Sequence, residues 1–353
     1  MKYPCIEVDL KKIEENTRFI VDKCNEKGIK SFVVTKVYCG NKEIAEASLR
    51  GGAYGIADSR VQNLEKVKDL DCPKLLLRIP MKSESEDVVK LADISLNSEM
   101  ETIILLDEEA RKQEKVHKII LMIDLGDLRE GVWFQSIDTI VEDILKLKNI
   151  KLHGIGTNLT CYGGVMPDDD NLGKLLEIKN EIEKKHNITL ETVSGGNSSS
   201  LYKVFNNTMP EGINMLRIGE TIVLGRETAY GELVEGMHDD AFILKGEIVE
   251  LKNKPSVPIG TIGMDAFGNK PTFEDRGEIR RAIVALGRQD VNPDGLEPLD
   301  EKIDILGASS DHLLMDVTNS SKEYRVGDIL EFKVDYGALL NVSTSEYVEN
   351  VIK

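Results

Sequence analysis

Ser31-Phe-Val-Val-Thr-Lys-Val-Tyr-Cys-Gly-Asn41 is the stretch around which the rest of the sequence is organised. Its apolar, β-branched start predicts a buried strand, with Lys36 at the carboxyl end. Gly40 ends the run, and Asn41 can cap a following helix. In a barrel of strands and helices, catalytic groups lie at this end of a strand. Partial desolvation there favours a neutral amine, which can attack a carbonyl; an exposed lysine is the alternative.

Short apolar runs recur along the first two thirds of the chain and alternate with helical periods. Eight strands are predicted, at residues 32–35, 53–57, 73–79, 92–96, 116–123, 152–156, 190–193 and 212–218. A further short strand precedes them within residues 2–8. This alternation is typical of an α/β fold of the (β/α)8 TIM-barrel type, and an open doubly wound sheet is the structural alternative.

The last third of the sequence has a different pattern. Strong helical periods give way to strand-like runs such as Phe242–Leu251 and Ile329–Val334, separated by turn-rich pieces. A chain of 353 residues is long enough for two cores. We therefore predict an α/β barrel over residues 9–227 and a C-terminal all-β domain over residues 228–353, joined by the N-terminal strand at residues 1–8.

Composition and charge restrict the function classes. The net charge of -17 argues against nucleic acid and anionic membranes as partners, and it favours attraction of a cationic substrate. No apolar run is long enough for a membrane span, and the N-terminus has no signal-peptide core, so we expect a cytoplasmic protein. The odd cysteine count and the spacing predict free thiols and no metal site. The cysteines are Cys5, Cys24, Cys39, Cys72 and Cys161.

Two polar stretches follow the seventh and eighth predicted strands. Ser194-Gly-Gly-Asn-Ser-Ser-Ser-Leu201 combines glycines with residues that cap helices, and free N–H groups at such a corner bind anions. Asn214-Met-Leu-Arg-Ile-Gly-Glu-Thr221 sets Arg217 at the end of its strand, before a second glycine turn. Together they predict a phosphate site of the barrel type. The alternatives are an ordinary polar turn and a structural salt bridge for Arg217.

With these motifs the sequence resembles alanine racemase and its fold-type III relatives. The shared features are a lysine after the first barrel strand, Asn-Ser after the seventh and Arg-x-Gly on the eighth. The resemblance covers essentially the whole chain, and Gly263–Gly268 and Leu306–His312 look most like the ornithine racemase branch. It implies a barrel with a C-terminal β domain, pyridoxal 5′-phosphate (PLP) as cofactor, and a head-to-tail homodimer.

The resemblance also implies roles for individual residues near the cofactor. Lys36 matches the lysine that binds PLP covalently. Ser198 matches a phosphate-binding serine, and Gly219 and Glu220 match backbone contacts to the phosphate. Arg217 matches the arginine that hydrogen-bonds the pyridine nitrogen.

Three further residues take roles by resemblance. Asp124-Leu-Gly-Asp-Leu-Arg129 is similar to the family's Asp-Thr-Gly-Met-x-Arg, which implies that Arg129 reaches the phenolic oxygen of PLP or the substrate carboxylate. Tyr336 matches a tyrosine that touches the phosphate; a buried strand tyrosine is the alternative. Asn158 stands where the family often stacks a histidine near the pyridine ring, so a polar contact is expected there instead.

An arginine opposite the pyridine nitrogen has a chemical consequence. A guanidinium keeps its proton near neutral pH, so the facing nitrogen is an acceptor and stays unprotonated. The ring then withdraws electron density from the substrate less strongly, and the proton returns more readily to the substrate Cα. This favours racemisation over transamination.

Racemisation needs a proton acceptor on each face of the substrate, and Lys36 serves only one. Alanine racemases take the second, a tyrosine, from the partner's Gly-Tyr-x-Asp-Gly segment, but Val257–Gly268 has no tyrosine. The candidates are Thr261, Asp265, Asp311 and His312. We choose His312 because imidazole titrates near neutrality. If Asp311 faces inward instead, as alternation along an extended segment allows, it suits the substrate's distal ammonium and Asp265 becomes the base.

The sequence therefore predicts a PLP-dependent amino-acid racemase for ornithine or another basic amino acid. Alternatives are a racemase for alanine or another amino acid, a PLP decarboxylase of the same fold, and a non-catalytic PLP-homeostasis protein. Related decarboxylases use a cysteine in a C-terminal Cys-Asp pair, whereas no cysteine follows Cys161. Related homeostasis proteins are single barrels without a β domain.

Overall fold

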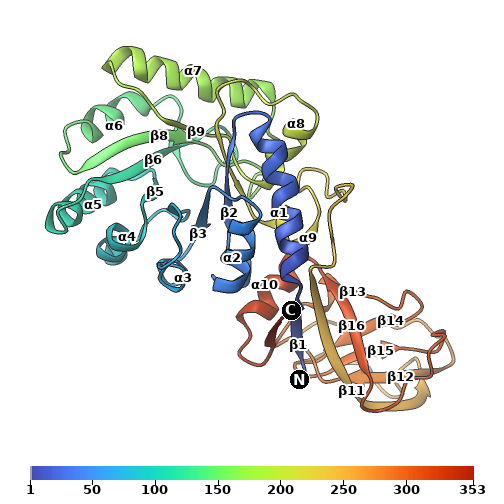
Figure 1. Cartoon of the computed structure of the whole chain (residues 1–353). Coiled ribbons are helices and arrows are strands. Elements are labelled where there is room, and N and C mark those ends of the chain that lie inside the picture. Colours follow the sequence, from blue (N-terminus) through green and yellow to red (C-terminus); the bar gives the residue numbers. More distant parts are fainter. Residues whose placement is uncertain (1) are drawn as a thin grey trace. The chain divides into compact units, whose positions relative to one another are not determined.

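A computed structural model describes residues 2–353, and the chain divides into two units. One unit is Leu10–Asp239; the other joins the N-terminal segment up to Asp9 with Asp240–Lys353 (Figure 1). Each unit is built around its own sheet. None of the helices within residues 2–353 has the length and apolar character needed to cross a bilayer.

Eight parallel strands form the sheet of the first unit. In sheet order they are β2 (Lys30–Val34), β3 (Gly55–Asp58), β4 (Lys74–Leu76), β5 (Ile94–Asn97), β6 (His117–Asp124), β8 (Ile150–Gly156), β9 (Thr192–Ser194) and β10 (Met215–Ile218). β10 pairs with β2 and β5 pairs with β6, so the sheet is closed. The predicted barrel is confirmed, and the open doubly wound sheet is excluded. A two-residue strand, β7 (Val132–Trp133), pairs with β6 outside the barrel.

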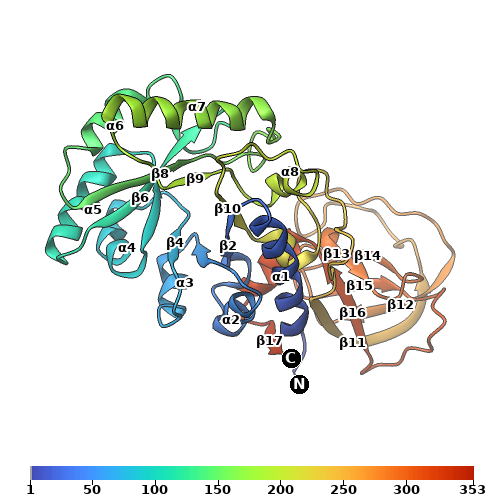
Figure 2. The same cartoon turned by 45° about the horizontal axis from the view of Figure 1, so that its top comes forward.

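Helices lie outside the strands of this unit (Figures 1 and 2). They are α1 (Leu10–Asn25), α2 (Lys42–Arg50), α3 (Val61–Lys66), α4 (Ser85–Leu91), α5 (Met100–Lys112), α6 (Ile137–Ile144), α7 (Asp169–His186), α8 (Leu201–Phe205) and α9 (Glu220–Leu224). Asn41 caps α2 as predicted, because its side chain accepts hydrogen bonds from Glu43 N at 3.0 Å and Ile44 N at 3.2 Å.

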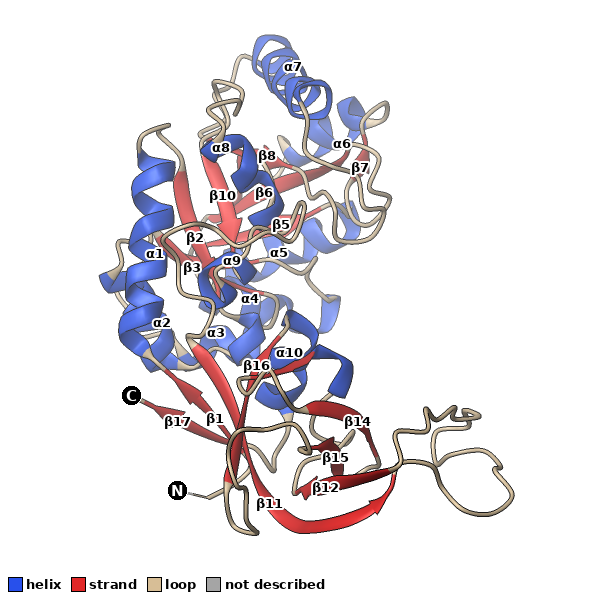
Figure 3. Cartoon of the chain, turned by 90° about the vertical axis from the view of Figure 1, so that its right-hand side faces the viewer, coloured by secondary structure: helices blue, strands red, loops and turns tan. Residues whose placement is uncertain are grey.

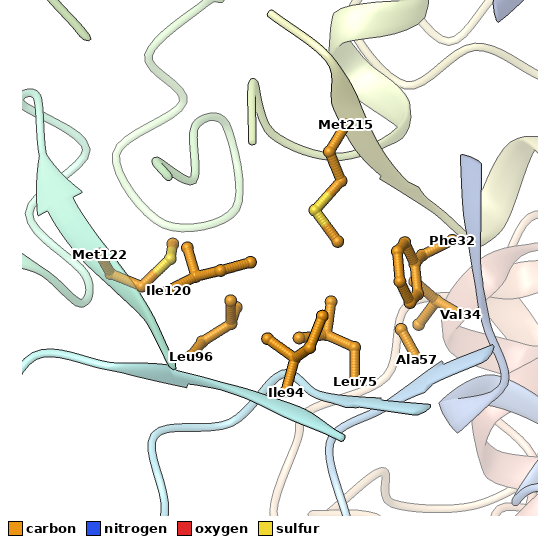
Figure 4. Packing of buried hydrophobic residues seen from close by; sticks show 9 residues of the cluster. All are labelled: Phe32, Val34, Ala57, Leu75, Ile94, Leu96, Ile120, Met122 and Met215. Atoms are coloured by element: carbon orange, nitrogen blue, oxygen red, sulfur yellow. The ribbon is translucent and has the colours of Figure 1, made fainter. Parts of the chain in front are cut away.

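Apolar side chains fill the interior of the barrel (Figure 4). The cluster consists of Phe32, Val34, Ala57, Leu75, Ile94, Leu96, Ile120, Met122 and Met215. Pairs from one strand are two residues apart, as the alternation of a strand requires. Arg217 follows Met215 by two residues on β10 and so shares its inward face.

The second unit contains an antiparallel sheet to which both ends of the chain contribute. Its strands are β1 (Cys5–Val8), β11 (Phe242–Pro255), β12 (Glu278–Val284), β13 (Leu296–Pro298), β14 (Asp304–Ala308), β15 (Leu313–Asp316), β16 (Ile329–Val334) and β17 (Glu349–Ile352). The sheet order is β13-β16-β11-β12-β15-β14, and β1 joins β11 antiparallel and β17 parallel. The helix α10 (Tyr336–Thr344) is an addition that the sequence did not predict.

One histidine on the barrel wall is almost completely buried. His117 is 3% exposed, and its Nε2 lies 2.8 Å from Ser95 Oγ, which also accepts from Asn97 Nδ2 at 2.8 Å. Burial, with a smaller effect of Lys115, lowers the pKa of His117 from 6.5 to about 4. The folded barrel therefore keeps this imidazole neutral well below neutral pH.

We expect acid to destabilise the protein through His117. Between pH 6.5 and about 4 the unfolded chain binds this proton and the folded chain does not, so stability falls as pH falls through that window. From pH 7 to pH 5 the loss from this group is about 2 kcal/mol. Urea unfolding followed by circular dichroism should show a smaller loss in His117→Gln. An equal loss in parent and variant would contradict the assignment.

Candidate active site

Lys36 lies at the carboxyl end of β2, where it begins a short 3-10 turn, η1 (Lys36–Tyr38). Its side chain is half-buried, in contrast to the exposed lysine of the alternative interpretation. The turn closes when Gly40 N donates to Thr35 O at 3.1 Å. Gly40 has a φ of 65°, and a Cβ there would lie 2.9 Å from the Cβ of Asn63, so the turn requires glycine.

Arg217 is buried at the carboxyl end of β10, the strand that pairs with β2. Its guanidinium donates to Ser194 Oγ and, at 2.9 Å, to Thr157 O, both of which are neutral acceptors. Burial lowers its pKa from 12.5 to about 10, so the group is still a cation at neutral pH. Across residues 2–353 it forms no ion pair, so the structural salt bridge proposed as the alternative is not found.

The two predicted anion-binding stretches meet in the structure. Ser198, which begins the 3-10 turn η3 (Ser198–Ser200), accepts a hydrogen bond on Oγ from Gly219 N at 3.2 Å. The hydroxyls of Ser199 and Thr221, on the same two segments, are buried and have no hydrogen-bond partner in the described part of the chain. These segments therefore hold polar groups that a bound anion can satisfy.

Gly219 also lies close to the lysine strand. A Cβ on Gly219 would approach Val34 Cβ to 3.0 Å, which is tight for a side-chain contact. Val34 is two residues before Lys36. The backbone of the eighth barrel strand is thus packed directly beside the end of the first, and Glu220 follows as the first residue of α9.

Arg129 lies in the loop after β6. Its guanidinium makes two hydrogen bonds to the carboxylate of the neighbouring Glu130. Burial acts to lower the pKa of Arg129, but the pair with Glu130 raises it overall. The Asn158 amide lies between two partners: Oδ1 accepts from Asn197 Nδ2 at 3.2 Å, and in the reversed orientation it accepts from Arg129 Nη2 at 3.2 Å.

The sequence analysis missed a buried carboxylate, Asp127, that ties two of these loops together. It accepts backbone hydrogen bonds from Tyr162 at 3.2 Å, Gly163 at 3.0 Å and Val165 at 3.3 Å. The loop after β8 is thereby fixed to the loop that carries Arg129. Its signal in the sequence was an aspartate in Asp124–Arg129, at the position where the similar motif Asp-Thr-Gly-Met-x-Arg has methionine.

Tyr336 occupies a different local structure from the strand tyrosine considered above. It is half-buried and is the first residue of α10, whose N-cap Asp335 accepts from Ala338 N at 2.7 Å. The strand before it, β16, ends at Val334. The interpretation as a buried strand tyrosine is therefore wrong, and the side chain lies at a helix start.

Asp265 lies in an exposed turn, where it has a structural task. Its Oδ1 accepts from Phe267 N at 2.9 Å and Asn269 N at 2.8 Å. These hydrogen bonds, that of Asn269 first, lower the pKa of Asp265 and make it a weaker base.

Asp311 and His312 lie in the turn between β14 and β15, where Ser309 N donates to His312 O at 2.9 Å. Both residues are exposed. The extended geometry expected for this pair is wrong, so strand alternation does not assign their side chains to opposite faces. Thr261 lies in the exposed segment between β11 and β12.

Arg288 links the turns that carry these candidates. Its backbone N donates to Ser309 O at 2.9 Å, and its guanidinium lies 5.2 Å from the ring centre of Phe267. Arg288 thus contacts both the turn that carries Asp265 and the turn that carries His312.

Comparison with known proteins identifies the family. Residues 8–227 match the family model described as alanine racemase, N-terminal domain. The chain is 52% identical over 349 residues to ornithine racemase of Acetoanaerobium sticklandii, covering 98% of this chain and 99% of the relative. It is 43% identical over 353 residues to lysine racemase of Thermotoga maritima, covering 99% of each.

A solved structure agrees in fold over the whole chain. Alanine racemase from Bartonella henselae with covalently bound pyridoxal phosphate superposes with a TM-score of 0.75 at 16% identity, covering 100% of both chains. The closed barrel, the antiparallel C-terminal sheet and the two close relatives lead to one assignment: this chain belongs to the alanine racemase family.

Proposed function

We propose that this protein is a PLP-dependent amino-acid racemase that acts on ornithine or another basic amino acid. Arg217 carries the proposal: it is a buried cation at the mouth of the barrel, and within residues 2–353 its hydrogen bonds go only to neutral acceptors. The named activities of the two close relatives, towards ornithine and lysine, support a basic substrate. The net charge of -17 favours attraction of such a cation.

The residues at the carboxyl ends of the strands fit PLP. Ser198 and Gly219 would hold its phosphate, helped by the unused hydroxyls of Ser199 and Thr221 and by Tyr336 from the β unit. The guanidinium of Arg217 would donate to the ring nitrogen, and the amine of Lys36 would bind the aldehyde carbon. The alanine racemase from Bartonella henselae, which shares this fold, carries covalently bound pyridoxal phosphate, and this supports the arrangement.

PLP, when bound, withdraws electrons from the substrate and so acidifies its Cα hydrogen. Lys36 moves a proton to and from Cα on one face. Arg217 keeps its own proton, since its pKa of about 10 is above neutral pH, and so leaves the ring nitrogen unprotonated. Arg129, held by Glu130 and beside Asn158, would bind the substrate carboxylate or the phenolic oxygen of PLP.

His312 is the proposed proton donor and acceptor on the opposite face. It is exposed and belongs to a turn that Arg288 fixes by a backbone hydrogen bond. Asp265 is second choice because its turn hydrogen bonds make it a weaker base. Asp311, the neighbour of His312, would suit the distal ammonium of a basic substrate.

A head-to-tail homodimer would bring the β unit of one chain to the barrel of the other. The segment 256–277 between β11 and β12 exposes apolar side chains, with Ile259 93% and Met264 80% exposed. Figure 3 shows this segment as the long loop that joins those strands. Exposed apolar side chains of this kind are typical of a surface that a partner covers. We place the enzyme in the cytoplasm, where its five cysteines would stay reduced.

Borohydride reduction of the PLP-loaded protein should leave the cofactor on the peptide that contains Lys36, because that amine is the proposed site of attachment. Peptide mapping by mass spectrometry measures this directly. Lys36→Ala, as the control, should leave no reduced adduct. An adduct on a different lysine of the parent protein would overturn the mechanism.

Tyr336→Phe should weaken PLP affinity by roughly one to two decades, because a hydrogen bond to a charged phosphate contributes about 1.5–3 kcal/mol. Equilibrium titration of the apoprotein with PLP measures the change. Tyr347→Phe removes the hydroxyl of a tyrosine in the same unit that is 63% exposed, and it serves as the matched control. Equal affinities in parent and Tyr336→Phe would argue against the contact.

His312→Asn should lose racemisation but still exchange the Cα hydrogen of one enantiomer with solvent deuterium, because Lys36 continues to serve its own face. Chiral chromatography and mass spectrometry of ornithine in D₂O separate the two outcomes. Asp265→Asn should racemise close to the parent rate. If Asp265→Asn loses racemisation and His312→Asn keeps it, Asp265 is the second base instead.

A further inference from the structure

A second buried carboxylate, Asp58, contacts the residue before Lys36, and the mechanism above does not use it. Asp58 ends β3, the strand next to β2, and is 0% exposed. Within residues 2–353 no lysine or arginine forms an ion pair with it, so only hydrogen bonds stabilise its charge. Burial raises the pKa of Asp58, and the hydrogen bond from Thr35 is the largest opposing effect.

Three donors surround this carboxylate. Oδ2 accepts from Thr35 Oγ1 at 2.6 Å. Oδ1 accepts from Arg60 N at 2.9 Å and from Asn63 Nδ2 at 3.1 Å. A buried carboxylate without a cation is costly to fold around, and an apolar residue of similar volume would avoid that cost.

Two of the three donors contact the turn that carries Lys36: Thr35 begins this turn, and Asn63 packs against it. Thr35 is the residue immediately before Lys36, and its backbone N also donates to Ala57 O at 2.9 Å. Asn63 is the residue against which Gly40 is packed, with no room for a Cβ between them. Since Gly40 N donates to Thr35 O, a single carboxylate fixes both ends of the turn from 35 to 40.

We propose that Asp58 is a positioning residue that holds the backbone of Lys36 through Thr35 and Asn63. The inference rests on the proposed function, in which Lys36 binds PLP. It goes further because it names Asp58, on the neighbouring strand, as the residue that holds Lys36 in position. The carboxylate acts on the turn and makes no contact with the cofactor or the substrate in this role.

The test measures how fast apoprotein captures added PLP on Lys36 in a borohydride-stable form. Thr35→Val leaves Asp58 in place but removes one of its donors, and capture should slow roughly tenfold. Thr35→Ser restores the hydroxyl and should capture at the parent rate. Asp58→Asn should also be slow, because hydrogen bonds to a charged carboxylate are replaced by weaker ones to a neutral amide.

Asp107→Asn is the matched control. Asp107 on α5 also accepts a backbone hydrogen bond, from Asn149 N at 2.7 Å, but that contact precedes β8 at the opposite end of its strand. This variant should capture PLP at the parent rate. Circular dichroism confirms that each variant is folded, and the threonine pair carries the test if Asp58→Asn is not.

The pH dependence of the visible absorbance of bound PLP is the second readout. The pH at which this absorbance changes should shift in Thr35→Val and return to the parent value in Thr35→Ser. A variant that only lost stability would keep the parent value. If both Thr35→Val and Asp58→Asn capture PLP at the rate of the parent protein and show its spectra, the proposal is overturned. A parent protein that does not attach PLP to Lys36 would instead refute the proposed function itself.

Discussion

The pairing of β10 with β2 closes the barrel, and the arrangement of the candidate active site depends on it. Its register sets Arg217 opposite Phe32 and Ile218 opposite Val33, so both strands end at the same rim. Lys36 follows one of these ends, and Gly219 follows the other. The hydrogen bonds that stabilise this pair of parallel strands thereby also fix the separation of Lys36 and Gly219, which lie far apart in the sequence.

The second constraint is electrostatic, because this rim contains buried charges of both signs. Arg217 donates to a hydroxyl and a carbonyl, and Asp58 accepts from a hydroxyl, an amide and a backbone N–H. Neutral partners leave each charge uncancelled, so it can act on its surroundings at short range. Such an interior is less stable than an apolar one, which is a common property of sites built for binding and chemistry.

The sequence was sufficient for the barrel because its strands are short, largely apolar runs that alternate with helical periods. The lysine strand, the Asn41 cap and the meeting of the Ser198 and Gly219 segments could all be predicted. The helix α10 could not, since Tyr336–Thr344 contains Gly337 and the β-branched Val342 and Thr344, which are weak helix formers. The links from Asp58 to Thr35 and from Asp127 to the loop after β8 could not be predicted either, because these donors are distant in the sequence and only the folded chain brings them to the carboxylates.

The assembly of the C-terminal sheet has a consequence for folding during synthesis. β1 is made before the barrel strands, yet its neighbours are β11, which starts at Phe242, and β17, which ends at Ile352. The barrel strands are complete in the chain once Ile218 has been made. β1 must therefore stay unpaired while the barrel is synthesised after it, and it gains its second neighbour only when β17 has been made. Strands that lie before and after all the barrel strands in the sequence are thus joined in one sheet.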